Sequence, residues 1–223
     1  SNTASVTPLD VWTPSGKYVK PQLSDQYAVG YYKNFKDDTF SVELEAYYKA
    51  VDNRIDYLDG SNLIGTNTIE TEILKGEARA YGLEVLLRKN KGRFTGWLAY
   101  TLSKSEQRSL GENAGGPGIN DGNWYNTAHD RTHDISMTGV YKLNDKWSMS
   151  ANMIFQTGRP VTYPNGQYEY EGLSIASYSN RNADRLPAYH RLDISATYKP
   201  NGNLDRRWQG EWVFGLYNVC LLY

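Results

Sequence analysis

The sequence predicts an all-β fold, an antiparallel up-and-down meander of about eight long strands. Three observations support this prediction. Apolar and polar residues alternate with period two over stretches of about ten residues. Short turn segments alternate along the chain with connections of roughly 25 to 30 residues. The 223 residues include 19 Tyr and 6 Trp, an excess typical of strands and of membrane interfaces.

Strand length and connection length together favour a transmembrane barrel over a soluble sandwich. A tilted strand needs about ten residues to cross a bilayer, whereas strands of soluble sheets usually have five or six. Outer-membrane barrels place short turns at one end and long loops at the other. A soluble sandwich has no physical reason to gather every long connection at one end of the meander.

The composition excludes several classes of protein. The formal net charge of −1 implies neither nucleic acid nor an anionic surface as partner. No run approaches the eighteen apolar residues of a membrane helix. The lone Cys220 excludes an internal disulfide framework and a cysteine metal cluster. Because residues 1–4 are polar, we expect that any export signal was removed or lies further upstream.

The first two strands follow an irregular lead-in over residues 1–20, which Pro8, Pro14 and Gly16 interrupt. We expect the first strand at about residues 26–34 and the second from residue 40. The second strand sets Phe40, Val42, Leu44, Ala46 and Tyr48 on one face against Ser41, Glu43, Glu45 and Tyr47 on the other. Two successive glutamates on one face indicate water on that side.

The third and fourth strands follow a long polar connection at about residues 53–76. The third strand sets Tyr81, Leu83, Val85 and Leu87 against Gly82, Glu84 and Arg88. The fourth strand, residues 94–103, alternates less cleanly, and Phe94, Leu98, Tyr100 and Leu102 are assigned to its apolar face. A second long loop, rich in Gly and Asn, is expected at about residues 105–131.

The clearest element is a β-hairpin over residues 135–155, turning at residues 144–146. Its rising strand sets Ile135, Met137, Gly139, Tyr141 and Leu143 against Asp134, Ser136, Thr138 and Lys142, with Val140 as the exception. Its descending strand sets Trp147, Met149, Ala151, Met153 and Phe155 against Ser148, Ser150, Asn152, Ile154 and Gln156. The apolar face would meet lipid in a barrel, or a second sheet in a sandwich.

Two further strands follow a third long loop at about residues 158–189. The seventh strand sets Leu192, Ile194, Ala196 and Tyr198 against Arg191, Asp193, Ser195 and Thr197. A link of intermediate length, residues 200–209, leads to a last apolar strand at residues 210–219. Eight strands are therefore expected.

Eight short segments, taken in order, carry a family resemblance. They are Val19-Lys20-Pro21-Gln22 with Ser24, Gln26, Tyr27 and Gly30; Tyr47-Tyr48-Lys49 with Asn53-Arg54-Ile55; Ala80-Tyr81-Gly82-Leu83-Glu84; Ala99-Tyr100-Thr101-Leu102-Ser103; Arg131-Thr132-His133-Asp134; Gln156-Thr157-Gly158-Arg159-Pro160-Val161-Thr162; Leu186-Pro187-Ala188-Tyr189-His190-Arg191-Leu192-Asp193; and Tyr217-Asn218-Val219. Together they resemble the barrel of TonB-dependent outer-membrane receptors of the Bacteroidetes type. Gln22 stands where that family usually has Glu.

The resemblance implies a barrel of about 22 strands, plugged by an N-terminal domain, that imports scarce ligands with energy passed on by TonB. It implies that residues 21–223 are a C-terminal barrel segment, since no plug domain or TonB box lies in these residues. The family usually continues through a final hairpin to a terminal aromatic residue. The end at residues 220–223 is therefore expected to be abnormal or truncated.

The same resemblance implies a location in the cell outer membrane, no enzymatic activity and no cofactor. The implied partners are outer-membrane lipid, the TonB complex through the N-terminal part, and a small ligand such as a siderophore, glycan or vitamin.

Aromatic loop residues are the candidates for ligand contact, because aromatic faces flanked by Asn and Arg suit a sugar or a cyclic siderophore. They are Trp124, Tyr125 and Asn126 in the second long loop, and Tyr163, Tyr168, Tyr170 and Tyr178 in the third. The alternative is a loop that packs on itself, or an aromatic belt. Six charged residues are expected to line the lumen, where they pair with each other or contact the plug: Glu43, Glu45, Glu84, Arg88, Arg191 and Asp193.

Catalysis and metal binding have little support, and no catalytic or metal-ligating residue is predicted. His129, His133 and His190 are separated by loops, and no nucleophile elbow occurs. His129-Asp130 and His133-Asp134 are interpreted as hydrogen-bonding residues at the loop base rather than a metal pair. Asn120, Asp121, Asn123 and Asp130 lack the spacing of an EF-hand.

One alternative function is a soluble or surface-anchored all-β glycan-binding module that uses the Tyr and Trp excess as a stacking platform. The outward apolar residues separate the two hypotheses, because they would be buried in a two-sheet core in such a module and exposed to lipid in a barrel. A further expectation concerns the isolated piece, whose two unpaired edges would recruit another copy or aggregate.

Overall fold

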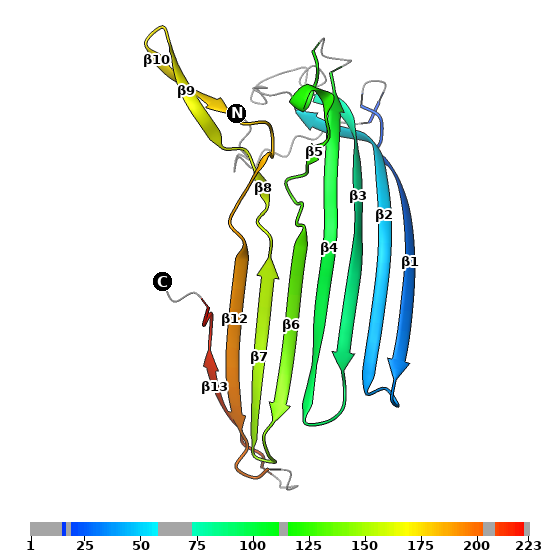
Figure 1. The fold of residues 1–223 in the computed structure, drawn as a ribbon, viewed down its shortest axis with the longest axis vertical. Coiled ribbons are helices and arrows are strands. Elements are labelled where there is room, and N and C mark those ends of the chain that lie inside the picture. The colour runs from blue at the N-terminus through cyan, green and yellow to red at the C-terminus, as the bar shows by residue number, and fades with distance from the viewer. Residues whose placement is uncertain (1–14, 17–18, 58–72, 112–115, 203–207, 221–223) are drawn as a thin grey trace.

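Eight long strands form one antiparallel sheet in the computed structural model, which describes residues 15–16, 19–57, 73–111, 116–202 and 208–220. Each strand pairs with the next long strand in the chain, in the order β1-β2-β3-β4-β6-β7-β12-β13 (Figure 1). The strands are β1 (Leu23–Phe35), β2 (Phe40–Tyr57), β3 (Ile73–Lys89), β4 (Phe94–Leu110), β6 (His133–Lys142), β7 (Trp147–Gln156), β12 (Tyr189–Tyr198) and β13 (Trp212–Leu216). The predicted up-and-down meander is confirmed.

The short turns lie together at one end of the sheet. Residues 36–38 turn between β1 and β2 with φ angles of 49°, 52° and 62°, a left-handed region that Asp tolerates. The β6–β7 turn is held by Asn144, whose Oδ1 accepts hydrogen bonds of 2.9 Å from the backbone N–H groups of Lys146 and Trp147. We call this end the short-turn end.

The long connections at the opposite end carry structure of their own. Between β4 and β6 lie η2 (Ile119–Gly122) and β5 (Tyr125–Asn126), which pairs with β4. Between β7 and β12, β8 (Pro160–Val161) pairs with β11 (Asp184–Arg185), and β9 (Pro164–Tyr170) forms a hairpin with β10 (Leu173–Tyr178). We call this end the long-loop end.

Three strands are much longer than the sequence predicted, β1 exceeds its predicted bounds by a few residues, and β13 covers only part of the expected residues 210–219. β2, β3 and β4 include residues 53–57, 73–76 and 105–110, which were expected in loops. Their apolar alternation stops before these residues, but the hydrogen-bonded ladder continues through them. The expectations for residues 1–14, 17–18 and 221–223 lie outside the described residues.

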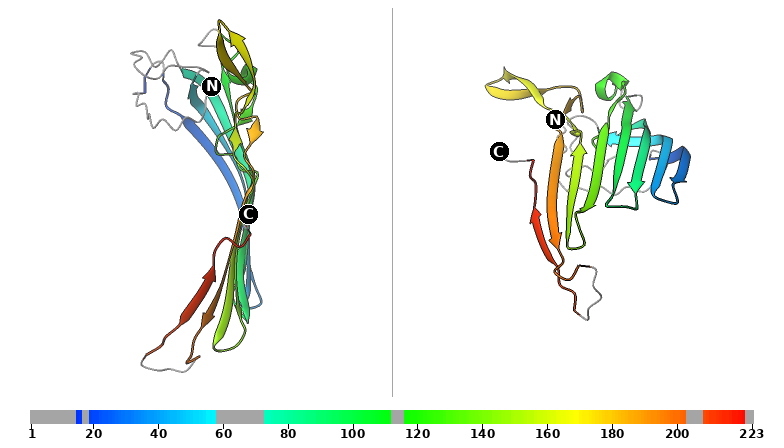
Figure 2. Two further views of the ribbon diagram at one scale, coloured as in Figure 1. Left: turned by 90° about the vertical axis from the view of Figure 1, so that its left-hand side faces the viewer. Right: turned by 60° about the horizontal axis from the view of Figure 1, so that its bottom comes forward.

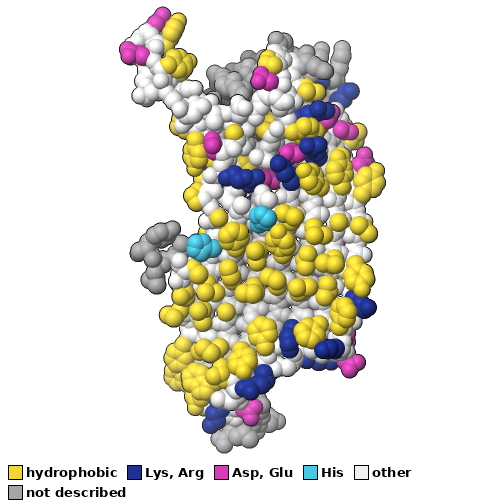
Figure 3. All heavy atoms as spheres, in the orientation of Figure 1, with side chains coloured by type: hydrophobic (Ala, Val, Ile, Leu, Met, Phe, Trp, Pro, Cys, Tyr) yellow, Lys and Arg dark blue, Asp and Glu magenta, His cyan; other side chains and the backbone are white. Residues whose placement is uncertain are grey.

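The register places most apolar residues of the eight strands on one face, which we call the apolar face, with Leu86, Trp97, Val140, Ile154 and Val213 as exceptions. Leu44 lies opposite Val85, for example, and Met137 lies opposite both Leu98 and Met153. Figure 3 shows this face as a hydrophobic band with charged side chains above and below it. The opposite face, which we call the polar face, carries most of the Ser, Thr, Asn and Glu side chains of the same strands.

Aromatic side chains form two rows on the apolar face. At the short-turn end the row includes Phe35, Phe40, Phe94, Tyr141, Trp147, Tyr198 and Trp212. The second row lies toward the long-loop end and includes Tyr27, Tyr48, Tyr81, Tyr100 and Phe155. Phe40 and Tyr48 lie roughly 26 Å apart along β2, or roughly 20 Å along the membrane normal at a tilt of about 40°. With the ring widths added, this matches the roughly 25 Å apolar band between two aromatic girdles.

The sheet is a single curved layer (Figure 2). Buried hydrophobic residues within the described ranges are Val19, Ile73, Leu74, Ile119 and Tyr125, all near the long-loop end. A soluble sandwich needs a second sheet against the apolar face, and the described part of the chain supplies none. The glycan-binding module therefore lacks the core that it requires. No helix among the described residues is long and apolar enough to cross a membrane.

Candidate functional site at the long-loop end

Three segments that are distant in the sequence meet at the long-loop end. Arg181, in the β7–β12 connection, donates from Nη2 to the carbonyl oxygen of Tyr57 at 3.1 Å. Its backbone N–H donates to Asn120 Oδ1 at 2.8 Å, and Asn120 Nδ2 returns a bond of 3.1 Å to the Arg181 carbonyl. Asn182 Nδ2 donates to the Asn126 carbonyl at 2.8 Å. These bonds join the end of β2 to both long connections.

Asp56 is the centre of this network. Its Oδ2 accepts hydrogen bonds of 2.7 Å from both Tyr125 Oη and Gln107 Nε2, and its Oδ1 lies 3.0 Å from Arg181 Nη1. The Arg181 side chain is only 7% exposed. A buried ion pair is tolerated when further hydrogen bonds satisfy its members. Here Tyr125 and Gln107 donate to the Asp56 carboxylate, and the Tyr57 carbonyl accepts from Arg181. We call Asp56, Gln107, Tyr125 and Arg181 the Asp56 network.

Tyr125 takes part in loop packing, one of the alternatives that the sequence left open. Its ring lies in a small hydrophobic cluster with Leu74 and Ile119. Burial, followed by the negative charge of Asp56, raises the pKa of its phenol to about 12. The hydroxyl is therefore protonated at physiological pH and remains a donor to Asp56.

Asp130 closes the base of the same loop. It is 1% exposed, accepts a hydrogen bond of 2.6 Å from the Ser105 backbone N–H, and pairs with Arg185. His133, in contrast, lies on the apolar face, where its Nδ1 is 3.0 Å from Tyr100 Oη. No group of three His, Cys, Asp or Glu side chains that could hold a metal ion occurs within the described ranges.

Trp124 lies on the apolar-face side of the extended strands, beyond the aromatic row. The guanidinium carbons of Arg79 and Arg108 lie 4.2 Å and 5.0 Å from its ring centroid. Arg79 also pairs with Glu106 at 2.8 Å, and Lys104 pairs with the same carboxylate at 3.0 Å. Burial opposes ionisation of Glu106, but the bonds and charges of Arg79 and Lys104 outweigh it and lower its pKa.

The β9–β10 hairpin presents the exposed tyrosines of the third long loop. Tyr168 and Tyr170 lie opposite Ile175 and Leu173, so the four side chains share one face of the hairpin. Tyr168 and Tyr170 are 56% and 60% exposed. Tyr178 lies opposite Pro164 at the base of the hairpin, and Tyr163 is exposed just before β9. The hairpin extends away from the end of the sheet (Figure 1).

The six charged residues expected in the lumen all lie on the polar face: Glu43, Glu45, Glu84, Arg88, Arg191 and Asp193. Arg88 pairs with Glu43 at 3.4 Å and Arg191 with Asp193 at 2.8 Å. Glu45 lies opposite Glu84 in the register and accepts a hydrogen bond of 3.0 Å from Tyr32 Oη. That these residues face a lumen stays a prediction.

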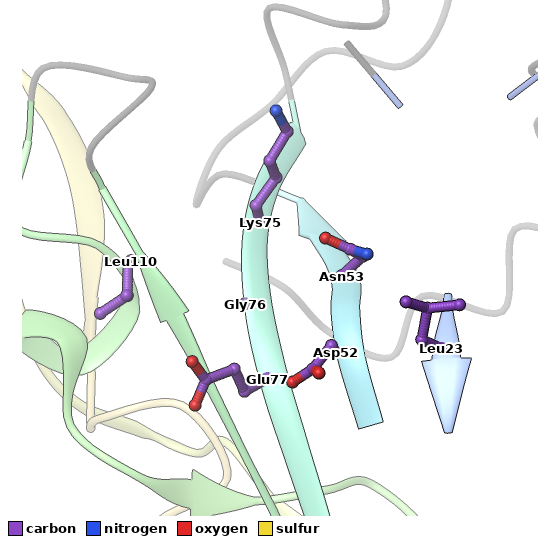
Figure 4. A pocket seen from close by; sticks show the side chains of 7 residues that line it. All are labelled: Leu23, Asp52, Asn53, Lys75, Gly76, Glu77 and Leu110. Carbon is purple, nitrogen blue, oxygen red and sulfur yellow. The ribbon is translucent and has the colours of Figure 1, made fainter. Parts of the chain in front are cut away.

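A pocket of about 520 Å³ opens where β2 departs from its regular pairing with β3. The register shifts between Val51 and Arg54, and Asn53 adopts a φ of 56° while its Nδ2 donates to the Pro21 carbonyl at 3.0 Å. Figure 4 shows Asp52 and Glu77 on neighbouring strands at this pocket, with Lys75 above them. Two carboxylates, one amide and one ammonium give the pocket a polar lining without a group of metal ligands.

Sequence reasoning missed Asp56, Gln107 and Arg181. They belong to three different segments, and Gln107 lies 51 positions from Asp56, so no local motif joins them. The available signals were weak: a carboxylate just past a predicted strand, and an arginine in a polar loop.

A lipid-facing sheet with elaborate connections at one end defines a segment of an outer-membrane β-barrel. The chain belongs to the family of TonB-dependent receptor-like β-barrels, whose model matches residues 2–219. This family comprises outer-membrane receptors and transporters rather than enzymes, and the chain is accordingly an outer-membrane barrel segment. No curated protein matches the chain.

Solved receptors share the fold at low sequence identity. The ferripyoverdine receptor of Pseudomonas aeruginosa, bound to ferripyoverdine, is 15% identical with a TM-score of 0.57, over 91% of this chain and 24% of its own. The ferric-catecholate import receptor Fiu of E. coli K12 is 16% identical with a TM-score of 0.57, over 94% of this chain and 26% of its own. This chain spans about a quarter of the length of these receptors.

Proposed function

We propose that the chain is the C-terminal barrel portion of a TonB-dependent transporter, which binds a small ligand outside the cell and admits it to the periplasm. The observation that carries this proposal is the convergence of the long connections at one end of a lipid-facing sheet, with exposed tyrosines on the β9–β10 hairpin. The Asp56 network supports it, because it fixes the loop bases from which ligand-contacting residues would project.

The ligand class is proposed as a siderophore, a glycan or a vitamin. The first of the two receptors is bound to ferripyoverdine and the second is a ferric-catecholate import receptor, which makes ferric siderophores the first class to test. In this proposal Tyr168 and Tyr170 offer flat apolar faces with a hydroxyl at one edge, which suits either aromatic catecholates or sugar rings.

Binding by hairpin variants of the full-length protein tests the assignment. Each lost aromatic contact costs about 0.5–1.5 kcal/mol beyond its area, so replacing Tyr168 and Tyr170 together by Ala should raise the Kd about 5- to 150-fold. The matched control replaces Gln167 and Glu169, which lie on the opposite face of the same hairpin. An equal loss of affinity in both variants, or no loss in either variant, would count against ligand contact by this face.

Energy dependence tests the transport step. Uptake by cells should stop when the proton-motive force is dissipated, while binding at the cell surface should persist. Uptake that continues without the proton-motive force would overturn the TonB-dependent assignment and leave the binding role standing.

A further inference from the structure

The apolar face carries a groove of about 570 Å³ between the two aromatic rows, close to the short-turn end. Its floor is made of small residues on three neighbouring strands. Gly96 on β4 lies opposite Gly139 on β6, which in turn lies opposite Ala151 on β7. A Cβ atom on Gly96 would lie 2.2 Å from the Thr138 carbonyl oxygen, so the floor there is bare backbone.

Large side chains wall the groove on both sides. Toward the short turns, Phe94 lies opposite Tyr141, which lies opposite Met149. Toward the long-loop end, Leu98 lies opposite Met137. All five residues line the groove, which is therefore apolar and about one side chain deep.

Two cations lie next to the groove, Lys89 opposite Gly96 at its β3 end and Arg93 on its short-turn side. Lys89 lines it, with its ammonium 5.3 Å from the Phe40 ring centroid and one hydrogen bond of 2.8 Å to the Lys91 carbonyl. The Arg93 guanidinium lies 5.5 Å from the Tyr141 ring centroid. Arg93 also donates from Nε to the Lys142 carbonyl at 3.2 Å and from Nη2 to the Leu143 carbonyl. Within the described residues neither cation pairs with a carboxylate, so the Lys89 ammonium and the remaining N–H groups of Arg93 can meet an external anion. Figure 3 shows Lys and Arg side chains along the lower border of the hydrophobic band.

We propose that this groove is a binding site for a phospholipid of the periplasmic leaflet, with one acyl chain in the groove and the phosphate at Lys89 and Arg93. The short-turn end of such a barrel faces the periplasm. Ammonium and guanidinium groups make charge-assisted hydrogen bonds to phosphate oxygens. An apolar groove with Lys89 in its lining and Arg93 beside the ring of its wall residue Tyr141 therefore matches an amphiphile with a hydrocarbon chain and an anionic head.

Retention of this lipid follows from packing rather than from hydrophobicity. An acyl chain gains no hydrophobic free energy by leaving the bilayer hydrocarbon for an apolar protein surface. Its association with the protein therefore depends on close van der Waals contact and on polar bonds of the head group. A smooth barrel wall offers a chain contact on one side only. The groove contacts it from the floor and both walls, and basic pockets next to such surfaces hold lipid head groups.

Native mass spectrometry of the full-length protein, extracted from outer membranes in mild detergent, tests the proposal. The wild type should retain one phospholipid, identified by its mass. Ala151→Leu should lose it by at least fivefold, because the larger side chain fills the floor of the groove. The matched control is Ala46→Leu, which enlarges an alanine of the same apolar face on β2, outside the groove, and it should retain the lipid.

A second pair of variants tests the contact with the phosphate head group separately from the contact with the acyl chain. Lys89→Gln should lower retention, whereas Lys33→Gln, a lysine on the apolar face of β1, should not. Heat-modifiable gel mobility confirms that each variant is folded. A wild type that carries no phospholipid, carries only detergent or lipopolysaccharide, or loses lipid equally in both alanine variants would overturn the proposal.

Discussion

Asp56 joins segments that lie far apart along the chain. Its carboxylate receives Tyr125 from one long connection and Arg181 from another, while Gln107 approaches from β4. Each partner alone would be a polar group buried at a cost, and the contacts with the Asp56 carboxylate reduce that cost. The order of the long-loop end therefore depends on a few buried polar atoms rather than on a large apolar core.

Removing the Tyr125 hydroxyl tests this dependence. Tyr125→Phe keeps the ring beside Leu74 and Ile119 but withdraws a donor from Asp56, so local opening should become easier by about 1–3 kcal/mol. Hydrogen exchange at residues 119–126 and 181–182 measures this change. Tyr168→Phe, which alters an exposed tyrosine, should change exchange there by less than about 0.5 kcal/mol. Equal protection in the two variants would contradict the account.

Glu106 gives the long-loop end a pH dependence of defined sign. Its folded-state pKa lies below the ordinary value of 4.5, so its ionised form stabilises the fold above that value. This stability is lost as the pH falls through the lowered pKa. Hydrogen exchange near Arg79 and Trp124 should therefore accelerate in acid in the wild type and depend less on pH in Glu106→Gln. An identical acid response in the variant would exclude Glu106 as the source.

At the scale of elements, successive residues of each strand face two different environments. On β6, Met137 belongs to the apolar face, whereas its neighbour Ser136 belongs to the polar face and pairs with Ala99 and Ile154. A strand in a closed soluble core would bury one of these two faces against protein. Here we expect the apolar face to meet lipid and the polar face to meet water.

Arginine at these two neighbouring positions should have opposite consequences. Met137→Arg places a charge in the hydrocarbon and should destabilise the folded barrel by about 2–4 kcal/mol. Ser136→Arg should cost far less, since its charge reaches the aqueous side. Urea unfolding of the full-length protein in lipid vesicles compares the two variants. Similar losses of stability would refute the assignment of the faces.

The sequence predicted these elements well where one physical rule governs them. Alternation placed Phe40 to Tyr48 and Trp147 to Phe155 on the correct face, because lipid requires apolar side chains at every second position. It failed at the ends of β2, β3 and β4, which continue past the lipid as ladders with mixed side chains on both faces. It also missed the Asp56 network, since contacts between residues 51 or more positions apart follow from loop folding rather than from local periodicity.

At the scale of the whole molecule, the sheet has two open edges. β1 and β13 end the strand order, and all 13 residues of β1 are exposed. An unpaired strand of this length is a template for pairing with another chain. In the solved receptors that share this fold, the matched region is about a quarter of the protein.

Expressed alone in detergent, the chain should therefore form edge-to-edge oligomers or aggregates, whereas the full-length protein should remain monodisperse. Light scattering after size-exclusion chromatography measures both. A stable monomer of the isolated chain would mean that the edges close or are covered within these residues.

The lipid-facing assignment of the apolar face is the central claim, and fractionation of the full-length protein tests it most directly. The protein should purify only from the outer-membrane fraction in detergent, and its gel mobility should change on heating, as expected of a folded barrel that resists the detergent until heated. A protein that stays monomeric and soluble without detergent would contradict the claim, because Leu44, Met137 and Ile194 would then have to be buried within the molecule.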